Sequence, residues 1–268
     1  MSAGPIPKIA RVDAPVTETA VLRKPQMHAN AQPFRPRQRW YLPLKFVVEF
    51  VVAALLLVVT VPVMLIAAIV VKLTSKGPAF FYQTRVGKDQ EEFTLIKLRT
   101  MVHNAEVLTG PVWSKPNDSR ITRVGAFLRD THIDEFPQLL NVLKGEMSLI
   151  GPRPERPEFV SKLQFQYSNY LDRSNVRPGI TGLAQLKLPP DYHVDDVKHK
   201  LAFDVYYVEN ISPGLDARIC LFTALRLTFE LANCGFRWMR LPSKGTVDRL
   251  YHSRNVNEFD EPIENPDL

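Results

Sequence analysis

The sequence predicts an α+β chain, mainly helical, in which a re-entrant, proline-broken membrane helix is followed by amphipathic helices, a small β-hairpin and a compact domain. Three observations predict this fold class. They are an apolar run over residues 46–71, two short β-like segments within residues 79–101, and helical spacing of apolar residues from residue 119 onward.

The apolar run, FVVEFVVAALLLVVTVPVMLIAAIVV, is interrupted by Glu49, Thr60 and Pro62. As a helix it would measure roughly 39 Å, which exceeds a hydrocarbon core about 30 Å thick. Pro62 lacks a backbone donor and clashes with the preceding turn, so we expect a kink between Val58 and Pro62. A kink allows the helix to return to the leaflet that it entered.

Basic residues flank this run on both sides, whereas a single crossing favours them on the cytoplasmic side alone. Both basic flanks stay in the cytoplasm if the helix re-enters, and one is exported if it spans. The flanks therefore favour a re-entrant helix, and an ordinary single-pass anchor stays open as the alternative. The flanking cations are Arg35, Arg37, Arg39 and Lys45 before the run, and Lys72, Lys76, Arg85 and Lys88 after it.

The composition of the sequence outside the apolar run indicates three further segments. Residues 1–43 hold seven prolines, carry a charge of +5 and lack periodicity, which predicts a disordered basic arm before the membrane helix of residues 44–73. Residues 74–235 are long enough to form one domain with its own core. Residues 236–268 form an extension with no assigned role.

The chain carries a net charge of +6. Beside a membrane helix, this excess of base favours anionic headgroups or a phosphorylated substrate, and no motif that reads nucleic acid is present. Cys220 and Cys234 lack the spacing of metal ligands and are expected to be buried, reduced thiols.

Two segments, AFFYQTRVG and EEFTLIKLRTM, alternate as strands do and are joined around residues 87–90. We therefore expect a β-hairpin, with Lys97 and Arg99 near the end of its second strand.

The segment SRITRVGAFLRD, residues 119–130, predicts an amphipathic helix. Its arginines lie apart from an apolar stripe formed by Ile121, Val124, Phe127 and Leu128. Such a helix can lie among lipid headgroups or pack on a protein core, and the pattern supports both equally.

An acidic pair precedes the next helix. Pro137 is best tolerated in a first helical turn, so Asp134 and Glu135 are expected at or just before the helix start, where the helix dipole would keep Asp134 ionised. An ionised carboxylate can accept a phosphoryl group. Adjacent helical positions diverge by about 100°, so the two acids could act as nucleophile and base in successive steps.

Attack of a carboxylate on a diphosphate needs a divalent cation and basic residues to offset the repulsion. Arg129, Arg153 and Arg177 are candidates. Arg153 follows a Gly-Pro turn and Arg177 precedes a Pro-Gly pair, so stiff loops would hold both. Solvated arginines and acids of a structural first turn are the alternative interpretation.

Other functional classes fit less well. A glycosidase needs two acids across a sugar rather than adjacent on a helix. A serine or cysteine hydrolase is not favoured, because the sequence contains no GxSxG motif and no cysteine in an electropositive motif. His132 is more typical of a polar surface residue than of a proton shuttle. A membrane-tethered scaffold stays open, and mutation of Asp134 would then spare its function.

Four motifs occur in register: IKLRTM, SRITRVGAFLRDTHIDEFPQLLNVLKGEMSLIGPRPE, VRPGITGLAQ and LAFDVYYVENIS. Together with the proline-broken helix they cover roughly Leu44 to Leu227, and the chain resembles the bacterial sugar transferases, or monotopic polyprenyl-phosphate phosphoglycosyl transferases, in their short form. The resemblance implies a re-entrant helix in contact with membrane lipids. It also implies interfacial helices and an active site on the cytoplasmic face of the bacterial inner membrane.

The resemblance also implies a reaction. Asp134 would attack the β-phosphate of a UDP-sugar, releasing UMP and leaving a covalent sugar phosphate, and Glu135 would activate the polyprenyl phosphate acceptor. Mg²⁺ is the implied cofactor, associated with Asp134, and Arg129 would bind phosphate or the lipid carrier.

Other basic positions also match the family. Arg153 and Arg177 match those near the nucleotide diphosphate, and Lys97 and Arg99 match a basic segment.

The chain departs from the family pattern at three places. Glu49 stands where aspartate is usual, Leu183 replaces a common tryptophan, and residues 187–189 replace an Asn-Gly-Arg segment that could contact the sugar or nucleotide. The sugar, the pathway and the oligomeric state, a homodimer included, stay open.

Overall fold

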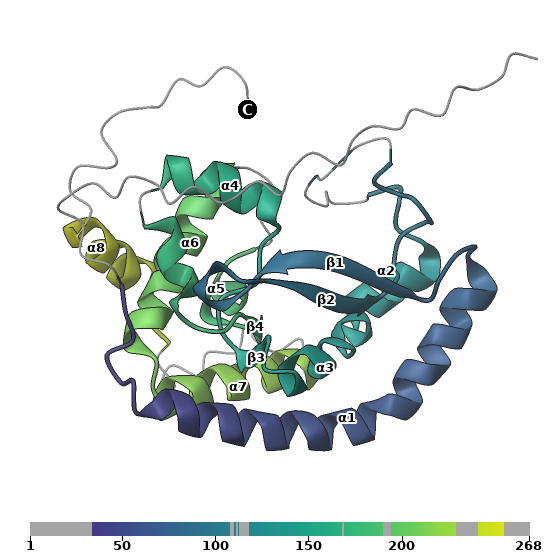
Figure 1. Cartoon of the computed structure of the whole chain (residues 1–268), viewed down its shortest axis with the longest axis horizontal. Helices are drawn as coiled ribbons and strands as arrows, with labels where there is room; N and C mark the ends of the chain where they lie inside the picture. Colours follow the sequence, from purple (N-terminus) through teal and green to yellow (C-terminus); the bar gives the residue numbers. More distant parts are fainter. Residues whose placement is uncertain are drawn as a thin grey trace, which may run out of the picture.

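The structure is a computed structural model that describes residues 34–107, 110, 112, 118–167, 169–189, 194–228 and 241–254. Helices surround two small sheets, as Figure 1 shows. The elements are α1 (Tyr41–Thr74), β1 (Phe80–Val86), η1 (Lys88–Gln90), β2 (Glu92–Leu98), α2 (Arg123–Asp130), η2 (Ile133–Glu135), α3 (Gln138–Leu143), β3 (Ser148–Ile150), α4 (Pro157–Gln166), η3 (Tyr170–Asn175), β4 (Gly179–Thr181), α5 (Leu183–Lys187), α6 (Val194–Asn210), α7 (Pro213–Thr228) and α8 (Lys244–Arg254). The chain is mainly helical with little strand, as predicted.

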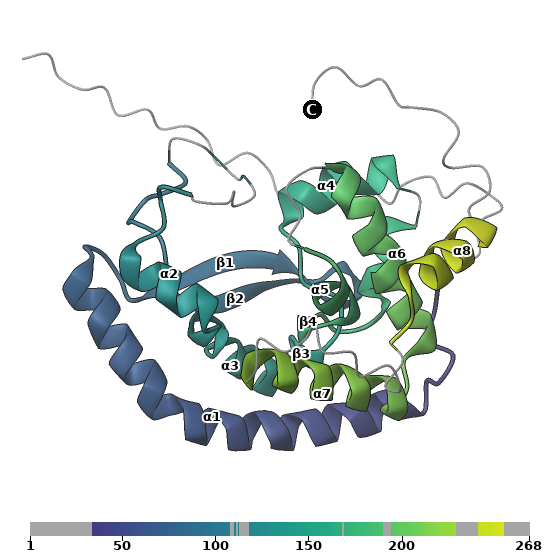
Figure 2. The ribbon, with the colours of Figure 1, turned by 180° about the vertical axis from the view of Figure 1, so that it is seen from behind.

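Helix α1 is one continuous helix that runs beneath the domain and bends past its middle (Figures 1 and 2). Pro62 lies within it and cannot donate to the carbonyl of Val58. The Thr60 hydroxyl donates to the Leu56 carbonyl over 2.8 Å, a contact that also bends helices. The predicted kink is therefore present, as a bend within one helix rather than a helical hairpin.

The predicted disordered arm is wrong near its end. Phe34 is 2% exposed and stacks on Tyr251 of α8, and its backbone N–H donates to Asp172 over 2.8 Å. Helix α1 then begins at Tyr41 instead of residue 44. The stacking of Phe34 on Tyr251 attaches the end of this proline-rich stretch to the domain. Residues 1–33 lie outside the described residues.

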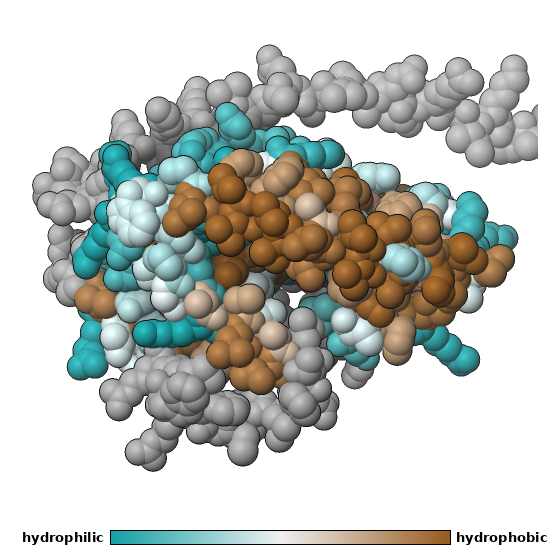
Figure 3. Space-filling view, turned by 90° about the horizontal axis from the view of Figure 1, so that it is seen from below, coloured by the Kyte–Doolittle hydropathy of each residue, from teal (hydrophilic) through white to brown (hydrophobic). Residues whose placement is uncertain are grey.

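One stripe of α1 faces the protein, and the rest of its surface is apolar and exposed. In the described part of the chain, α1 is the one helix long and apolar enough to cross a membrane. Seen from below, it forms a broad hydrophobic band (Figure 3). The buried stripe consists of Tyr41, Lys45, Glu49, Ala53, Met64, Ala67 and Val71.

Both halves of α1 pack on the same domain. Ala53 joins a cluster with Leu95 of β2 and Val142 of α3, and Val71 joins another with Leu98 of β2 and Leu128 of α2. The helix therefore lies along the domain over most of its length.

The predicted hairpin is confirmed, since β1 pairs antiparallel with β2, with Phe80 opposite Leu98 and Val86 opposite Glu92. The second sheet was not predicted. It joins β3 and β4 in parallel, with Ser148 opposite Gly179. Three-residue strands so far apart in sequence leave no periodic signal.

The largest core cluster surrounds α6, where Phe203, Tyr207 and Val208 are at most 1% exposed. Helix α7 adds Ile219, but its Cys220 is exposed, so the prediction of a buried thiol is wrong there. Cys234 lies outside the described residues.

The predicted amphipathic helix is confirmed only in part, because α2 begins at Arg123 instead of residue 119 and Phe127 of the predicted apolar stripe is exposed. Leu128 is 3% exposed and packs inward, whereas Phe127 is 60% exposed. The Thr122 side chain accepts a hydrogen bond from the Gly125 N–H and caps the helix start. The inward stripe favours core packing for one face, and contact of the outer face with a membrane stays a prediction.

Gly125 allows α2 to approach the strand end closely, because a Cβ there would lie 1.9 Å from the Thr100 carbonyl oxygen. We expect Gly125→Ala to push α2 outward and to lower the free energy of unfolding by about 1–3 kcal/mol. Thermal unfolding in detergent measures this. Gly214→Ala on α7, where nothing lies within 4 Å, is the control, and equal destabilisation by both would contradict the argument.

Candidate functional site

The acidic pair lies in η2, a single 3₁₀ turn between α2 and α3. His132, in the left-handed conformation with φ 57°, turns the chain out of α2. Pro137 directly precedes α3, as predicted. Asp134 is 7% exposed, and the side chain of Glu135 is 13% exposed. Both acids are thus held in the protein rather than on a solvated helix end.

Glu135 is paired with two cations through one oxygen. Its Oε1 accepts from Lys97 Nζ over 2.9 Å and from Arg153 Nη2 over 2.8 Å. Burial alone would raise the pKa of Glu135, but Arg153 and Lys97 together lower it well below its usual range. Glu135 therefore stays ionised and ties β2 to the loop after β3.

Asp134 has a different environment. Within the part of the chain that the structure describes, its carboxylate makes no hydrogen bond or ion pair. Burial raises the pKa of Asp134, and the charges of Lys97 and Arg129 offset this only in part. The predicted stabilisation of the Asp134 charge is therefore wrong in direction, because burial has the largest effect on its pKa.

Three of the predicted basic residues surround the pair. Burial lowers the pKa of Lys97, and the Glu135 carboxylate raises that of Arg153. Arg129 donates through Nε to Thr100 Oγ1 over 2.9 Å, and its charge reaches Asp134. Lys97, Arg129 and Arg153 thus create a cationic environment suited to phosphate groups.

Two predicted basic residues lie elsewhere. Arg99 donates to the Ser75 carbonyl over 3.0 Å and also to the Lys76 carbonyl. These bonds fix the backbone directly after α1. Arg177 donates to the Gly145 carbonyl over 2.8 Å and lies 4.4 Å from the centre of the Phe46 ring. Both arginines fasten the domain to α1 or its end and make no contact with the acidic pair.

Sequence reasoning missed a buried charged network behind the Arg153 loop. Arg173 of η3 pairs with Asp204 of α6 over 2.6 Å, and Lys200 pairs with Glu155. These cations lower the pKa of Glu155 to about 2, against the effect of burial. The signal was present: Asp204 interrupts the apolar segment 201–208.

A second missed network lies at the start of α1. Lys45 Nζ bridges Glu49 over 2.6 Å and Asp216 over 2.7 Å, and all three are buried. Glu49 also accepts from the Ser148 hydroxyl and from the Ile150 N–H. Charged residues four apart within an apolar run were the available signal.

The family of the chain follows from its sequence. A family model described as bacterial sugar transferase matches residues 40–230. The chain belongs to the bacterial sugar transferases. The match covers the acidic pair and both networks, and ends before α8.

Several named proteins resemble this sugar transferase. An Aeromonas hydrophila UDP-N-acetylgalactosamine-undecaprenyl-phosphate N-acetylgalactosaminephosphotransferase is 44% identical over 162 residues, 60% of this chain and 38% of that protein. A Caulobacter vibrioides UDP-glucose:undecaprenyl-phosphate glucose-1-phosphate transferase is 41% identical over 181 residues, 67% of each chain. A Bacillus subtilis protein named as a putative undecaprenyl-phosphate N-acetylgalactosaminyl 1-phosphate transferase is 47% identical over 133 residues, 50% of this chain and 74% of that protein. The matched segment thus spans well under half of the first relative and two thirds or more of the other two.

Proposed function

We propose that this sugar transferase moves a sugar 1-phosphate from a UDP-sugar to a membrane polyprenyl phosphate, undecaprenyl phosphate, in two steps. In the first step a carboxylate oxygen of Asp134 attacks the β-phosphorus of the donor, and the bond to UMP breaks. In the second step a phosphate oxygen of the acceptor attacks the same phosphorus and releases Asp134. The product is a polyprenyl-diphosphate sugar, the first intermediate of a polysaccharide or glycoconjugate.

The contrast between the two acids carries this proposal. Glu135 binds two cations, whereas the adjacent buried Asp134 has no described partner. An unpaired carboxylate beside Lys97, Arg129 and Arg153 can reach a phosphorus whose oxygens those cations neutralise. The names of the relatives support the donor and acceptor classes.

The low pKa of Glu135 bears on its role. A carboxylate paired with Arg153 and Lys97 is a weak base, so the resting site does not favour the predicted activation of the acceptor by proton removal. We propose instead that Glu135 orients these two cations toward the donor phosphates.

The residues present fit Mg²⁺. No cluster of three or more His, Cys, Asp or Glu that could hold a metal occurs among the described residues, and Mg²⁺ is commonly held by one or two carboxylates together with substrate phosphates and water. The unpaired Asp134 carboxylate would hold the ion. When bound, Mg²⁺ would neutralise charge on the diphosphate.

The contacts of α1 support a re-entrant position on the cytoplasmic face of the inner membrane. The start of α1 is fixed to the domain by Lys45, and its end by Arg99, which supports a position of both ends on the same side of a bilayer. This geometry would bring a lipid-bound phosphate to the domain while the nucleotide sugar stays in water.

The proposed reaction is tested with the purified protein in detergent, undecaprenyl phosphate, Mg²⁺ and a panel of UDP-sugars that includes UDP-glucose and UDP-N-acetylgalactosamine. We expect UMP release with at least one donor and its incorporation into lipid. No turnover with any donor, from protein that still melts cooperatively, would favour the scaffold alternative.

Removal of divalent cations should stop turnover. We expect loss of UMP release in excess EDTA and its recovery on addition of Mg²⁺, because two anionic reactants repel each other without the ion. Full turnover in EDTA would contradict the assignment of Mg²⁺.

The pH profile should depend on Asp134. Its pKa is raised by burial, so the ionised nucleophile is lost as pH falls through a value above that of an ordinary carboxylate, while Glu135 stays ionised. Lys97→Met removes a charge that lowers the pKa of Asp134, so the acid limb of UMP release should move to higher pH. Lys88→Met, exposed in the hairpin turn, is the control, and a limb that moves to lower pH in Lys97→Met would contradict the assignment.

A further inference from the structure

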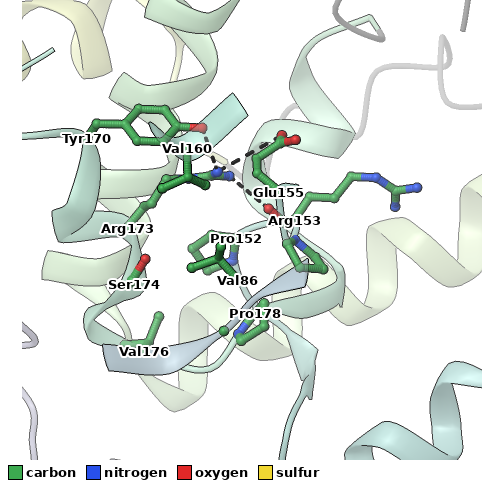
Figure 4. A pocket seen from close by; sticks show the side chains of 12 residues that line it. Val86, Pro152, Arg153, Glu155, Val160, Tyr170, Arg173, Ser174, Val176 and Pro178 are labelled. Atoms are coloured by element: carbon green, nitrogen blue, oxygen red, sulfur yellow. Dashed lines mark hydrogen bonds and ion pairs between the residues drawn. The ribbon is translucent and has the colours of Figure 1, made fainter. Parts of the chain in front are cut away.

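The loop that carries Arg153 is fastened from behind by Arg173. This guanidinium is 7% exposed, and its Nη2 donates to the backbone carbonyl of Arg153 over 2.8 Å. The Arg153 side chain extends away from Arg173 and its neighbours, as Figure 4 shows. The same residue is therefore bonded through its backbone to Arg173 and through its side chain to Glu135.

The rest of the loop has little freedom. A Cβ on Gly151 would lie 2.4 Å from the Arg177 carbonyl oxygen, so this residue packs directly on the neighbouring backbone. Pro152 and Pro154 fix their own φ angles, and Pro154 also restricts Arg153. The Pro152 carbonyl accepts from the Gly179 N–H over 2.9 Å and the Pro154 carbonyl accepts from Arg85 over 2.9 Å, and the bond from Arg173 fixes the Arg153 carbonyl between them.

Asp204 in turn fixes Arg173. Its Oδ2 accepts from Nη2 over 2.6 Å and from Nε over 3.1 Å, a contact that sets the plane of the guanidinium. Nη1 donates to the Tyr170 hydroxyl over 3.2 Å and lies 4.0 Å from Glu155. Glu155 is itself held by Lys200, so Asp204 of α6 is the main anchor of Arg173.

We propose that Arg173 and Asp204 are positioning residues, which hold the Arg153 side chain against Glu135 and thereby set the geometry of the cationic site. Neither residue contacts the acidic pair. Their effect on turnover rests on the proposed function, whereas their effect on Arg153 can be measured without turnover.

The first experiment follows the guanidinium protons of Arg153 by NMR at a single pH, in protein with ¹⁵N-labelled arginine and assignment by Arg153→Lys. In the wild type, the bond from Arg153 to Glu135 Oε1 should slow the exchange of these protons with water. The double variant Arg173→Met/Asp204→Leu removes both partners of the buried ion pair. This destabilises a protein less than removal of one partner, which leaves the other charge buried and unpaired.

We expect the guanidinium protons of Arg153 to exchange about tenfold or more faster in this double variant, because Arg153 is released from Glu135. Turnover should fall about 10- to 100-fold with a smaller change in KM, as for a misplaced binding group. Tyr170→Phe, which removes the Tyr170 hydroxyl but keeps the bonds to Asp204 and Arg153, is the control and should show the exchange of the wild type.

Unchanged exchange of the Arg153 guanidinium protons in a folded double variant would overturn the proposal, even if turnover is lost. If the double variant does not fold, Arg173→Lys serves instead. Its shorter stem and compact ammonium cannot reproduce the guanidinium fork, so a smaller increase in the exchange of Arg153 is expected and no increase would overturn the proposal. Absence of wild-type turnover would refute the proposed function alone, because the exchange measurement does not depend on it.

Discussion

Asp134→Asn is expected to lower sugar-phosphate transfer about a thousandfold or more, because an amide cannot replace the carboxylate that attacks phosphorus. Label retained on the protein after incubation with a donor carrying radioactive β-phosphate, without acceptor, should disappear as well. Equal covalent labelling of wild type and variant would refute the role of Asp134. Asp130→Asn, four residues earlier and exposed, is the control that should keep both activities.

The stability of the same variant should not fall. Burial raises the pKa of Asp134, so its charge is held at a cost that asparagine removes. We expect a melting temperature equal to or above that of the wild type. Glu135→Gln should behave in the opposite way and lose about 3–5 kcal/mol of stability, because Lys97 and Arg153 would lose their shared carboxylate. Of the two adjacent acids, Asp134 would then act in the chemistry alone, whereas Glu135 would also stabilise the fold.

Much of the fold was predictable because its signals are local. The apolar run with Pro62, the alternating strands of the hairpin and the proline before α3 each depend on neighbouring residues. The acidic pair and three of its basic neighbours were also named from sequence. Lys97 and Arg153 do reach Glu135.

What the sequence could not predict depends on contacts between distant segments. Arg99 and Arg177 have the same residue type as Arg153, but α1 and the turn at Gly145 provide their acceptors instead. The direction in which the pKa of Asp134 shifts could not be predicted either. Burial by the surrounding elements has a larger effect on this pKa than the position of Asp134 before a helix. Burial is a property of the assembled domain.

The second large effect is expected at the start of α1, where Lys45 is the shared cation of two buried carboxylates. Its side chain is 7% exposed, and Nζ lies 2.6 Å from Glu49 and 2.7 Å from Asp216. Lys45→Met would leave two carboxylates buried together without a cation. We expect a loss of about 3–5 kcal/mol, and a melting temperature lower by about 10 °C or more for a protein of this size.

Lys72→Met is the matched control, because this lysine is also on α1 but is exposed, and its ammonium donates to the Gly77 carbonyl over 3.2 Å with no carboxylate partner among the described residues. A triple variant, Lys45→Met/Glu49→Gln/Asp216→Asn, removes all three charges and should recover part of the loss. If Lys45→Met melts within about 2 °C of the wild type, a shift equivalent to less than about 1 kcal/mol, the network does not stabilise the attachment of α1. Recovery in the triple variant would show that the loss in Lys45→Met comes from carboxylates buried without a cation. The loss that remains in the triple variant would then measure what the charged network adds to the apolar contacts of Ala53 and Val71.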